Sequence, residues 1–236
     1  MPAAQVELRR IADLAAEARA QGLAWLTPAE RERLRAITAP ARQAAFLAGH
    51  WQARARVAQW LGLAPHRIEW ATEAQGRPRL CLAGEALPLH VSLSHSGDWL
   101  ALVLAEVPVG IDLELPRRAR DWSALAAFTF APEECARLAE AGASMRKALF
   151  HRLWALKEAH AKRSGRGLGV RAARALCARP AAAAFADAWT WDIGAGALAL
   201  AGAPGVQVQW LAWEWADPPA APAGWHYVGP HARGRD

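Results

Sequence analysis

The same order of helical and strand-like segments occurs twice along this 236-residue chain and limits the folds that it can adopt. In each set, helical patterns come first and short strand-like runs follow. The first set has helices that start at Pro28 and Pro40, then strand-like runs at 67–71, 89–93, 100–104 and 109–115. The second has helical patterns over about 121–140 and 145–163, then runs at 189–193, 197–201 and 206–215. Because helices followed by strands are typical of α+β proteins, we predict an α+β fold of two similar halves, residues 1–115 and 116–236.

Short sequence motifs indicate where several helices begin or end. Thr27-Pro28-Ala29-Glu30 is a capping box with proline at the first helical position. Gly62 suits the left-handed residue that ends the helix from Pro40. Residues 1–26 predict a helix over Ile11–Ala20 and no strand, and the proline-rich stretch 217–224 predicts a loop.

Composition excludes several classes of protein. Hydrophobic residues make up 53% of the chain, too many for a disordered protein. No uncharged apolar stretch is long enough to cross a membrane, and charges interrupt the N-terminus before any signal-peptide core. The three cysteines are far apart, which favours reduced thiols. We therefore expect a cytoplasmic protein, and two internal halves favour a monomer.

The charge balance at first favours a nucleic-acid partner, because 28 Lys and Arg against 22 Asp and Glu give a formal net charge of +6. The arginines, however, are scattered from Arg9 to Arg235 and form no nucleic-acid-binding motif, so that function is the less favoured alternative. Only three of the 28 basic residues are lysines, and Lys147, Lys157 and Lys162 all fall within 16 residues. A compact ammonium differs chemically from a guanidinium, so this lysine cluster indicates a candidate site.

The strand-like segment Val109-Gly110-Ile111-Asp112-Leu113-Glu114 carries acids at alternate positions. The period of two puts Asp112 and Glu114 on one face of the strand. Two neighbouring carboxylates repel each other unless a cation or a proton compensates, and Mg²⁺ binds one or two carboxylates together with substrate phosphates. The alternative is a strand end whose acids are simply solvated.

The second candidate element is the helical pattern that contains two of the lysines. Steps of four place Phe150, Trp154, Glu158 and Lys162 in a row on one face. The aromatic residues would anchor this face in the core, so that Glu158 could serve as a metal ligand or base and Lys162 as a phosphate clamp. The alternative is an ordinary surface pair of Glu and Lys, worth roughly 0.2–0.5 kcal/mol.

The third element is Val91-Ser92-Leu93-Ser94-His95-Ser96-Gly97, a strand that runs into a turn. A lone histidine is more often structural than catalytic. A serine hydrolase is disfavoured because the G-x-S-x-G elbow is missing. The sequence also lacks the H-E-x-x-H zinc motif, the P-loop and the dinucleotide fingerprint.

Taken together, the three elements resemble the signature of 4′-phosphopantetheinyl transferases. The matching segments are Ser92–Ser96, Val109–Glu114 and Phe150-x-x-x-Trp154-x-x-Lys157-Glu158-Ala159-x-x-Lys162-x-x-Gly165-x-Gly167-Leu168. Their order and spacing resemble the single-chain surfactin-synthetase type rather than the short trimeric holo-carrier-synthase type. The resemblance covers residues 27 to 170.

The resemblance implies roles for individual residues. It implies Asp112, Glu114 and Glu158 as Mg²⁺ ligands, with Glu158 as the alternative base. It implies catalytic or phosphate-binding roles for Lys162 and His95. The coenzyme A contacts that it implies are Arg42, Gly76, Arg77, Pro78, Ser94, His95, Lys157 and Lys162. His50 stands where many relatives have arginine.

The implied reaction is transfer of the 4′-phosphopantetheine group from coenzyme A to a serine of an acidic apo carrier protein, with release of 3′,5′-ADP. The carrier could be an acyl or a peptidyl carrier protein of fatty-acid, polyketide or nonribosomal peptide synthesis. The active site is expected between the two halves, where the acidic strand meets the lysine-bearing helix. A catalytically silent protein that only binds carriers is the alternative within the family.

Overall fold

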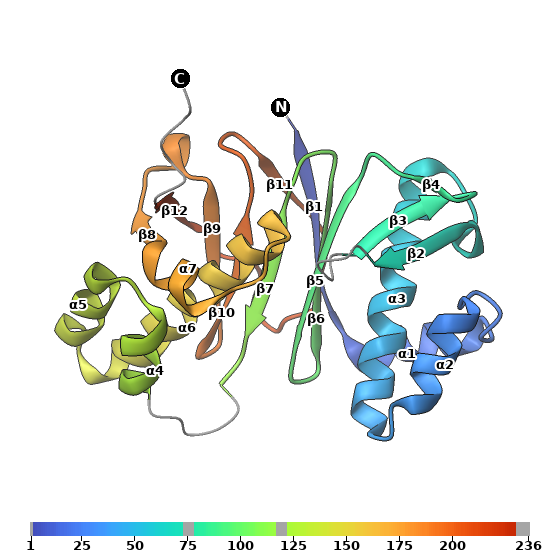
Figure 1. Cartoon of the computed structure of the whole chain (residues 1–236), viewed down its shortest axis with the longest axis horizontal. Helices are drawn as coiled ribbons and strands as arrows, with labels where there is room; N and C mark the ends of the chain where they lie inside the picture. The colour runs from blue at the N-terminus through green and yellow to red at the C-terminus, as the bar shows by residue number, and fades with distance from the viewer. Residues whose placement is uncertain (1, 73–77, 117–121, 230–236) are drawn as a thin grey trace.

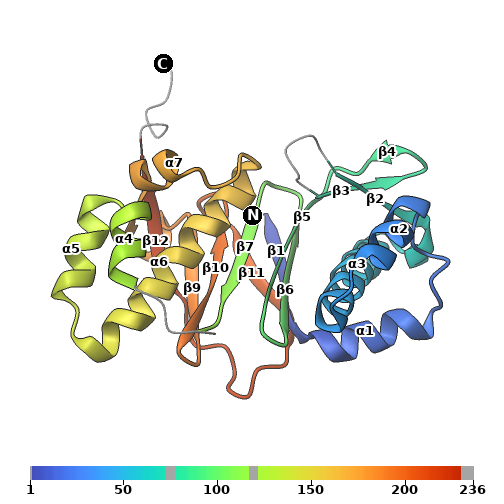
Figure 2. The same ribbon diagram turned by 60° about the horizontal axis from the view of Figure 1, so that its bottom comes forward.

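Two β-sheets pack face to face and helices cover both outer sides (Figure 1). This computed structural model describes residues 2–72, 78–116 and 122–229. Turning the molecule shows α1 to α3 against one sheet and α4 to α7 against the other (Figure 2). The predicted α+β fold is therefore confirmed.

The first half of the chain supplies three α-helices and seven strands among its described residues. In order these are β1 (Ala3–Arg10), α1 (Ile11–Ala20), α2 (Pro28–Ala36), α3 (Pro40–Leu61), the 3₁₀ turn η1 (Pro65–Arg67), β2 (Ile68–Thr72), β3 (Pro78–Leu82), β4 (Glu85–Ala86), β5 (His90–Ser96), β6 (Trp99–Ala105) and β7 (Gly110–Glu114). Both predicted helix ends are confirmed. Thr27 and Glu30 form the capping box, and Gly62 ends α3 with a φ of 66°.

The helices and strands of the second half differ in part from those predicted. It contains α4 (Trp122–Thr129), α5 (Pro132–Glu140), α6 (Ala143–Ser164), α7 (Val170–Ala175), β8 (Cys177–Pro180), η2 (Ala183–Phe185), β9 (Ala188–Ile193), β10 (Gly196–Ala201), β11 (Gln207–Trp213) and β12 (Ala223–Val228). The single helix predicted over 121–140 is wrong, because Pro132 cannot continue a helix and instead begins α5. The loop predicted over 217–224 overlaps the first two residues of β12.

Strand β1 was missed by the sequence prediction and is central to the first sheet. Its buried residues Ala4, Val6 and Leu8 alternate with polar ones, which is the pattern of a strand with one buried face. Glu7 is also buried, because Arg56 and Gln52 pair with its carboxylate. Gln5 and Glu7, which lie between the buried apolar residues, therefore belong to the opposite face of β1, and Glu7 is buried there.

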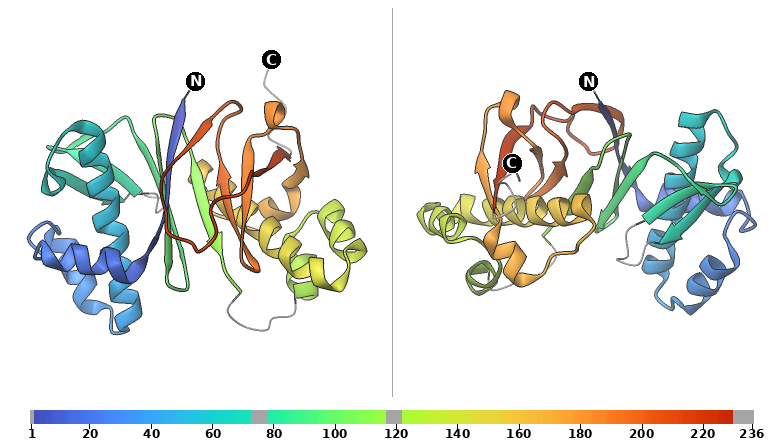
Figure 3. Two further views of the ribbon diagram at one scale, coloured as in Figure 1. Left: turned by 180° about the vertical axis from the view of Figure 1, so that it is seen from behind. Right: turned by 45° about the horizontal axis from the view of Figure 1, so that its top comes forward.

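The two large sheets exchange strands between the halves of the chain. The first sheet has the order β11-β1-β6-β5 and the second β7-β10-β9-β12-β8, while β2-β3-β4 form a small third sheet. Strand β11 from the second half runs parallel to β1, as seen from behind in Figure 3. Strand β7 from the first half pairs with β10. The division at 115/116 stays a prediction, and the sheets cross it in both directions.

Side-chain alternation separates the layers. On β6, Leu100, Leu102 and Leu104 pack under α1 and α3, while the small residues between them face the second sheet. On β10, Leu198 and Leu200 face the first sheet and the alternating alanines pack under α6. The same rule places alternate residues of β7 under α6, where the candidate site lies.

Candidate functional site

The site begins with the close packing of α6 on β7. Ile111 and Leu113 of β7 lie in the core between the sheets, so the opposite face of the strand meets the helix. A Cβ atom on Gly110 would lie 2.1 Å from the carbonyl oxygen of Ala159 and 2.4 Å from the backbone nitrogen of Arg163. Glycine therefore permits this approach, which brings Asp112 under the last turns of α6.

Asp112 is the centre of the site. The residue is 4% exposed, and Oδ1 accepts hydrogen bonds from Lys162 Nζ at 2.6 Å and Ser94 Oγ at 2.8 Å. Within the described part of the chain, Oδ2 is buried and has no hydrogen-bond partner. A buried carboxylate oxygen without a partner is costly unless a ligand or cation completes its environment.

Glu158 lies one helical turn before Lys162 and is half-buried. Burial and the negative charge of Asp112 raise the pKa of Glu158, and the Lys162 ammonium lowers it. The predicted row on α6 is observed, with the Phe150 and Trp154 rings stacked 6.1 Å apart in the core below these charged residues. One ammonium thus faces two carboxylates in a region largely shielded from solvent.

The carboxylate oxygens of Asp112 and Glu158 are ligands of the kind that a hard divalent cation binds. Among the described residues, no group of three His, Cys, Asp or Glu side chains is placed to hold a metal ion. The structure does bring Asp112 near Glu158 and leaves Asp112 Oδ2 without a partner among the described residues, and burial together with the charge of Asp112 raises the pKa of Glu158. Because Mg²⁺ takes one or two carboxylates together with substrate phosphates, these residues fit the ion and its site stays a prediction.

The remaining residues of the acidic strand and the serine segment take different positions. Glu114 ends β7 on the same face as Asp112 and is partly buried. Ser94, expected to contact coenzyme A, donates its hydroxyl to Asp112 instead. His95 is exposed and lies on the opposite face of β5 from Ser94, which is the side covered by α3.

The prediction that Lys157 contacts coenzyme A is wrong for this structure. Its ammonium is fully buried and bonds to the Glu134 carboxylate at 2.8 Å and to the carbonyl oxygens of Ala173 and Leu176 at 2.7 and 2.5 Å. These acceptors use all three ammonium hydrogens. Lys157 therefore ties α6 to α5 and to the α7 segment.

Two of the predicted nucleotide contacts, Arg42 and Pro78, lie on elements other than those that carry Asp112, Glu158 and Lys162. Arg42 is exposed on the first turn of α3. Gly76 and Arg77 lie outside the described residues, and Pro78 begins β3. His50, at the position where relatives have arginine, is largely buried, and its Nδ1 bonds to Glu30 at 2.6 Å.

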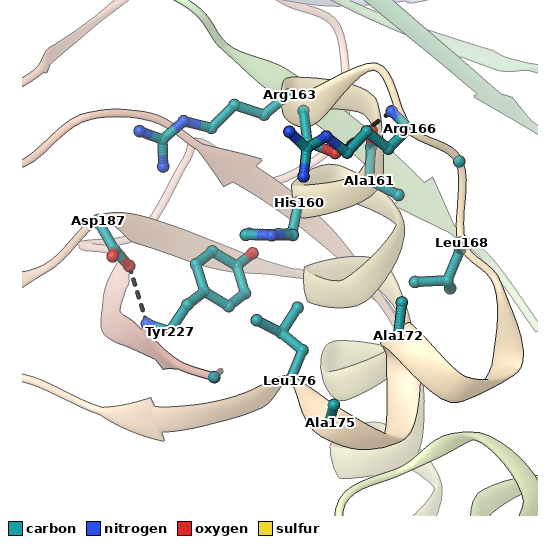
Figure 4. A pocket seen from close by; sticks show the side chains of 13 residues that line it. His160, Ala161, Arg163, Arg166, Leu168, Ala172, Ala175, Leu176, Asp187 and Tyr227 are labelled. Carbon is teal, nitrogen blue, oxygen red and sulfur yellow. Dashed lines mark hydrogen bonds between the residues drawn. The ribbon is translucent and has the colours of Figure 1, made fainter. Parts of the chain in front are cut away.

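A pocket of about 390 Å³ lies beside the end of α6 (Figure 4). Arg163 and Arg166 stand at its rim, and Leu168 and Leu176 form part of its apolar wall. The backbone N–H of Tyr227, also in the lining, donates to Asp187 at 3.0 Å. Asp112, Glu158 and Lys162 do not line this pocket. After residue 170 the family resemblance was one of strand pattern only and predicted no site residue, so Asp187 and Tyr227 were missed.

Comparison with known proteins matches the part of the chain that carries these side chains. Residues 108–191, which contain β7 and α6, match the sequence model of the 4′-phosphopantetheinyl transferase superfamily. The chain is 32% identical over 167 residues to the 4′-phosphopantetheinyl transferase HetI of a Nostoc species, an alignment covering 70% of each protein. The chain belongs to the 4′-phosphopantetheinyl transferase superfamily.

Two further relatives show which type of transferase the chain is similar to. A 4′-phosphopantetheinyl transferase of Bacillus subtilis is 30% identical over 125 residues, which are 52% of this chain and 53% of that protein. The transferase Sfp of B. subtilis strain 168 is 25% identical over 148 residues, which are 63% of this chain and 64% of that protein. The resemblance to the surfactin-synthetase type is thereby confirmed. The alignments span about half to two thirds of these two relatives.

The described helices were also tested for membrane spans. Over residues 2–72, 78–116 and 122–229, no helix has the length and apolar character that crossing a bilayer requires.

Proposed function

We propose that the chain transfers the 4′-phosphopantetheine group of coenzyme A to a serine hydroxyl of an apo acyl or peptidyl carrier protein. The observation that carries this proposal is the group formed by the buried Asp112 and the partly buried Glu158 and Lys162, which lies within the segment matched to the superfamily. Its carboxylates and ammonium suit a pyrophosphate, a divalent cation and a hydroxyl that must lose a proton.

In the proposed reaction, the carrier serine oxygen attacks the phosphorus that bears the pantetheine arm. A phosphodiester forms, the bond within the pyrophosphate breaks, and 3′,5′-ADP leaves with the electron pair. Glu158 accepts the serine proton, a role that its raised pKa supports. The Lys162 ammonium neutralises charge on the phosphates.

Asp112 and Glu158 would hold Mg²⁺, which when bound supplies further neutralisation of phosphate charge, and Glu114 is the third ligand that the family resemblance implies. His95, Arg42 and Arg77 would hold the nucleotide and phosphates, as the family resemblance implies. The carrier we propose is acidic, and the net charge of +6 suits it. We propose a monomer, because both contributors to the site, β7 and α6, come from one chain.

The test combines the protein with coenzyme A, Mg²⁺ and several apo carriers, and looks for addition of phosphopantetheine by intact mass spectrometry. A gain of that mass on at least one carrier is expected. Carrier binding without mass gain would favour the silent carrier-binding protein instead. Neither binding nor mass gain, from folded protein, would contradict the proposed function.

Substitutions test the assigned residues in the same assay. Glu158→Ala should lower the transfer rate by about 100-fold or more, the size of effect that loss of a proton acceptor produces. Asp112→Ala removes a proposed ligand of Mg²⁺ and should also lower the transfer rate strongly. Glu133→Ala is the matched control, because this exposed carboxylate pairs with Arg179 on the surface and should leave the rate unchanged. A near-normal rate in Asp112→Ala would contradict the assignment of this residue.

A further inference from the structure

Strands β5 and β7 are edge strands of different sheets, and they lie side by side at the centre of the molecule. Three buried serines at alternate positions of β5 bond to β7 or to Leu115, the residue that follows it. The hydroxyl oxygens of Ser92 and Ser96 accept hydrogen bonds from the backbone N–H groups of Ile111 at 3.1 Å and Leu115 at 3.0 Å. An edge strand presents unpaired N–H groups. These two serines therefore satisfy part of the open edge of β7.

Ser94 makes a different contact from the serines on either side of it. Its hydroxyl donates to Asp112 Oδ1 at 2.8 Å, and Lys162 donates to the same oxygen at 2.6 Å. Both bonds converge on Oδ1, while Oδ2 is buried with no hydrogen-bond partner among the residues that the structure describes. The carboxylate is thus held by one oxygen, and the other oxygen is left for a ligand.

We propose that Ser94 is a positioning residue for Asp112, whose Oδ1 it holds so that Oδ2 is oriented toward a divalent cation. This inference rests on the proposed function, of which the cation is a part. Ser92 and Ser96 differ from Ser94 in their partners, because they accept from the backbone N–H groups of Ile111 and Leu115 and do not bond to the Asp112 carboxylate. Hydrogen-bonding partners of metal ligands typically change metal affinity by roughly 10- to 100-fold.

The geometry also explains why β5 alternates serine with other residues. The even positions Ser92, Ser94 and Ser96 face the acidic strand, and Leu93 packs toward Gly49 of α3. Strand β5 therefore packs against α3 with one face and bonds to the acidic strand with the serines of the other face. A hydroxyl suits this place because it is small and can either donate or accept a hydrogen bond.

The test measures Mg²⁺ binding to the whole chain by isothermal titration calorimetry, without coenzyme A or carrier. Ser94→Ala should weaken Mg²⁺ binding about tenfold and raise the Mg²⁺ concentration for half-maximal transfer by the same factor. Ser94→Thr keeps the hydroxyl and should bind Mg²⁺ like the wild type. The matched control is Ser92→Ala, which removes a buried hydroxyl of the same strand. It should lower the thermal midpoint and leave Mg²⁺ affinity unchanged.

Equal Mg²⁺ affinity in Ser94→Ala and the wild type would overturn the proposal. An equal loss in Ser92→Ala would overturn it too, because the serines would then have only a structural role. A wild type that binds no Mg²⁺ would also overturn it. A wild type that binds Mg²⁺ but modifies no carrier would contradict the proposed function, while calorimetry would still decide the role of Ser94. If Ser94→Ala does not fold, Ser94→Cys provides a weak donor of similar size for the same titration, with weaker binding expected.

Discussion

At the start of α2, the Glu30 carboxylate is the acceptor of a buried network that the Asp112 site does not use. It receives hydrogen bonds from the Thr27 backbone, from His50 Nδ1 at 2.6 Å and from the fully buried Arg54 guanidinium at 2.8 Å. Burial by itself raises the pKa of Glu30, but the bonds from His50, Thr27 and Arg54 outweigh it and lower the pKa to about 2. The ionised form of Glu30 therefore stabilises the folded chain.

This network predicts an acid-sensitive stability. Because the folded-state pKa lies below the ordinary value of 4.5, the stabilisation is complete above that pH and is lost as pH falls toward about 2. The shift corresponds to about 3 kcal/mol. Urea unfolding should therefore show no loss of stability from this network between pH 7 and about pH 5, and a growing loss as the pH falls from about 5 to about 3.

A substitution isolates the contribution of Glu30. Glu30→Gln leaves the buried Arg54 charge without its partner and should lower the free energy of unfolding at pH 7 by about 3 kcal/mol. The difference from the wild type should shrink as the pH is lowered. Glu133→Gln, at an exposed pair, should leave the unfolding midpoint unchanged. A Glu30→Gln variant as stable as the wild type at pH 7 would contradict this account.

At the scale of elements, the contact between β7 and α6 depends on the absence of a side chain at Gly110. The atoms that a Cβ would meet belong to the backbone of Ala159 and Arg163, so they cannot turn aside as a flexible side chain would. Helix α6 is fixed on its other side by the Lys157–Glu134 ion pair. The helix therefore has little freedom to move away from the strand.

Gly110→Ala should consequently lower the free energy of unfolding by about 3 kcal/mol or more, because the added methyl group overpacks two backbones. Urea denaturation followed by circular dichroism measures this loss. Gly169→Ala is the control, since a Cβ there meets open space, and it should change stability by less than about 1 kcal/mol. Equal stabilities of the two variants would show that α6 can shift to accept the methyl group.

At the scale of the whole molecule, the exchange of β7 and β11 between the sheets makes the two halves one interdependent body. The core between the sheets contains residues from β1, β6, β7, β9 and β10. The site therefore lies beside the junction of the two sheets, and the net charge of +6 of the whole chain acts on a partner as a long-range field.

The charge of the whole chain predicts how salt affects the proposed reaction. If the partner is an acidic carrier, attraction to a protein of net charge +6 speeds encounter and is screened by ions. Raising NaCl from about 50 to about 300 mM should lower kcat/KM for the carrier several-fold and change kcat much less. Steady-state kinetics at saturating coenzyme A measures both quantities. An unchanged kcat/KM would contradict an electrostatically guided encounter.

The sequence by itself determined the features that depend on neighbours along the chain. Local motifs predicted the capping box at Thr27 and the helix end at Gly62. Local periodicity predicted the alternating acids of β7 and the row from Phe150 to Lys162. These local patterns also carried the family resemblance. They were sufficient for the α+β class and for placing Asp112, Glu158 and Lys162 in one candidate site.

Only the tertiary structure decided which of the neighbouring residues face that site. Lys157 and Lys162 belong to one motif, yet five helical residues rotate by about 140°, so Lys157 turns to Glu134 and Lys162 to Asp112. Likewise Ser94 bonds to Asp112 because β5 lies next to β7, a pairing between edges of different sheets. Such contacts join residues distant in the chain, and the burial and partners that fix them arise only when the layers pack together.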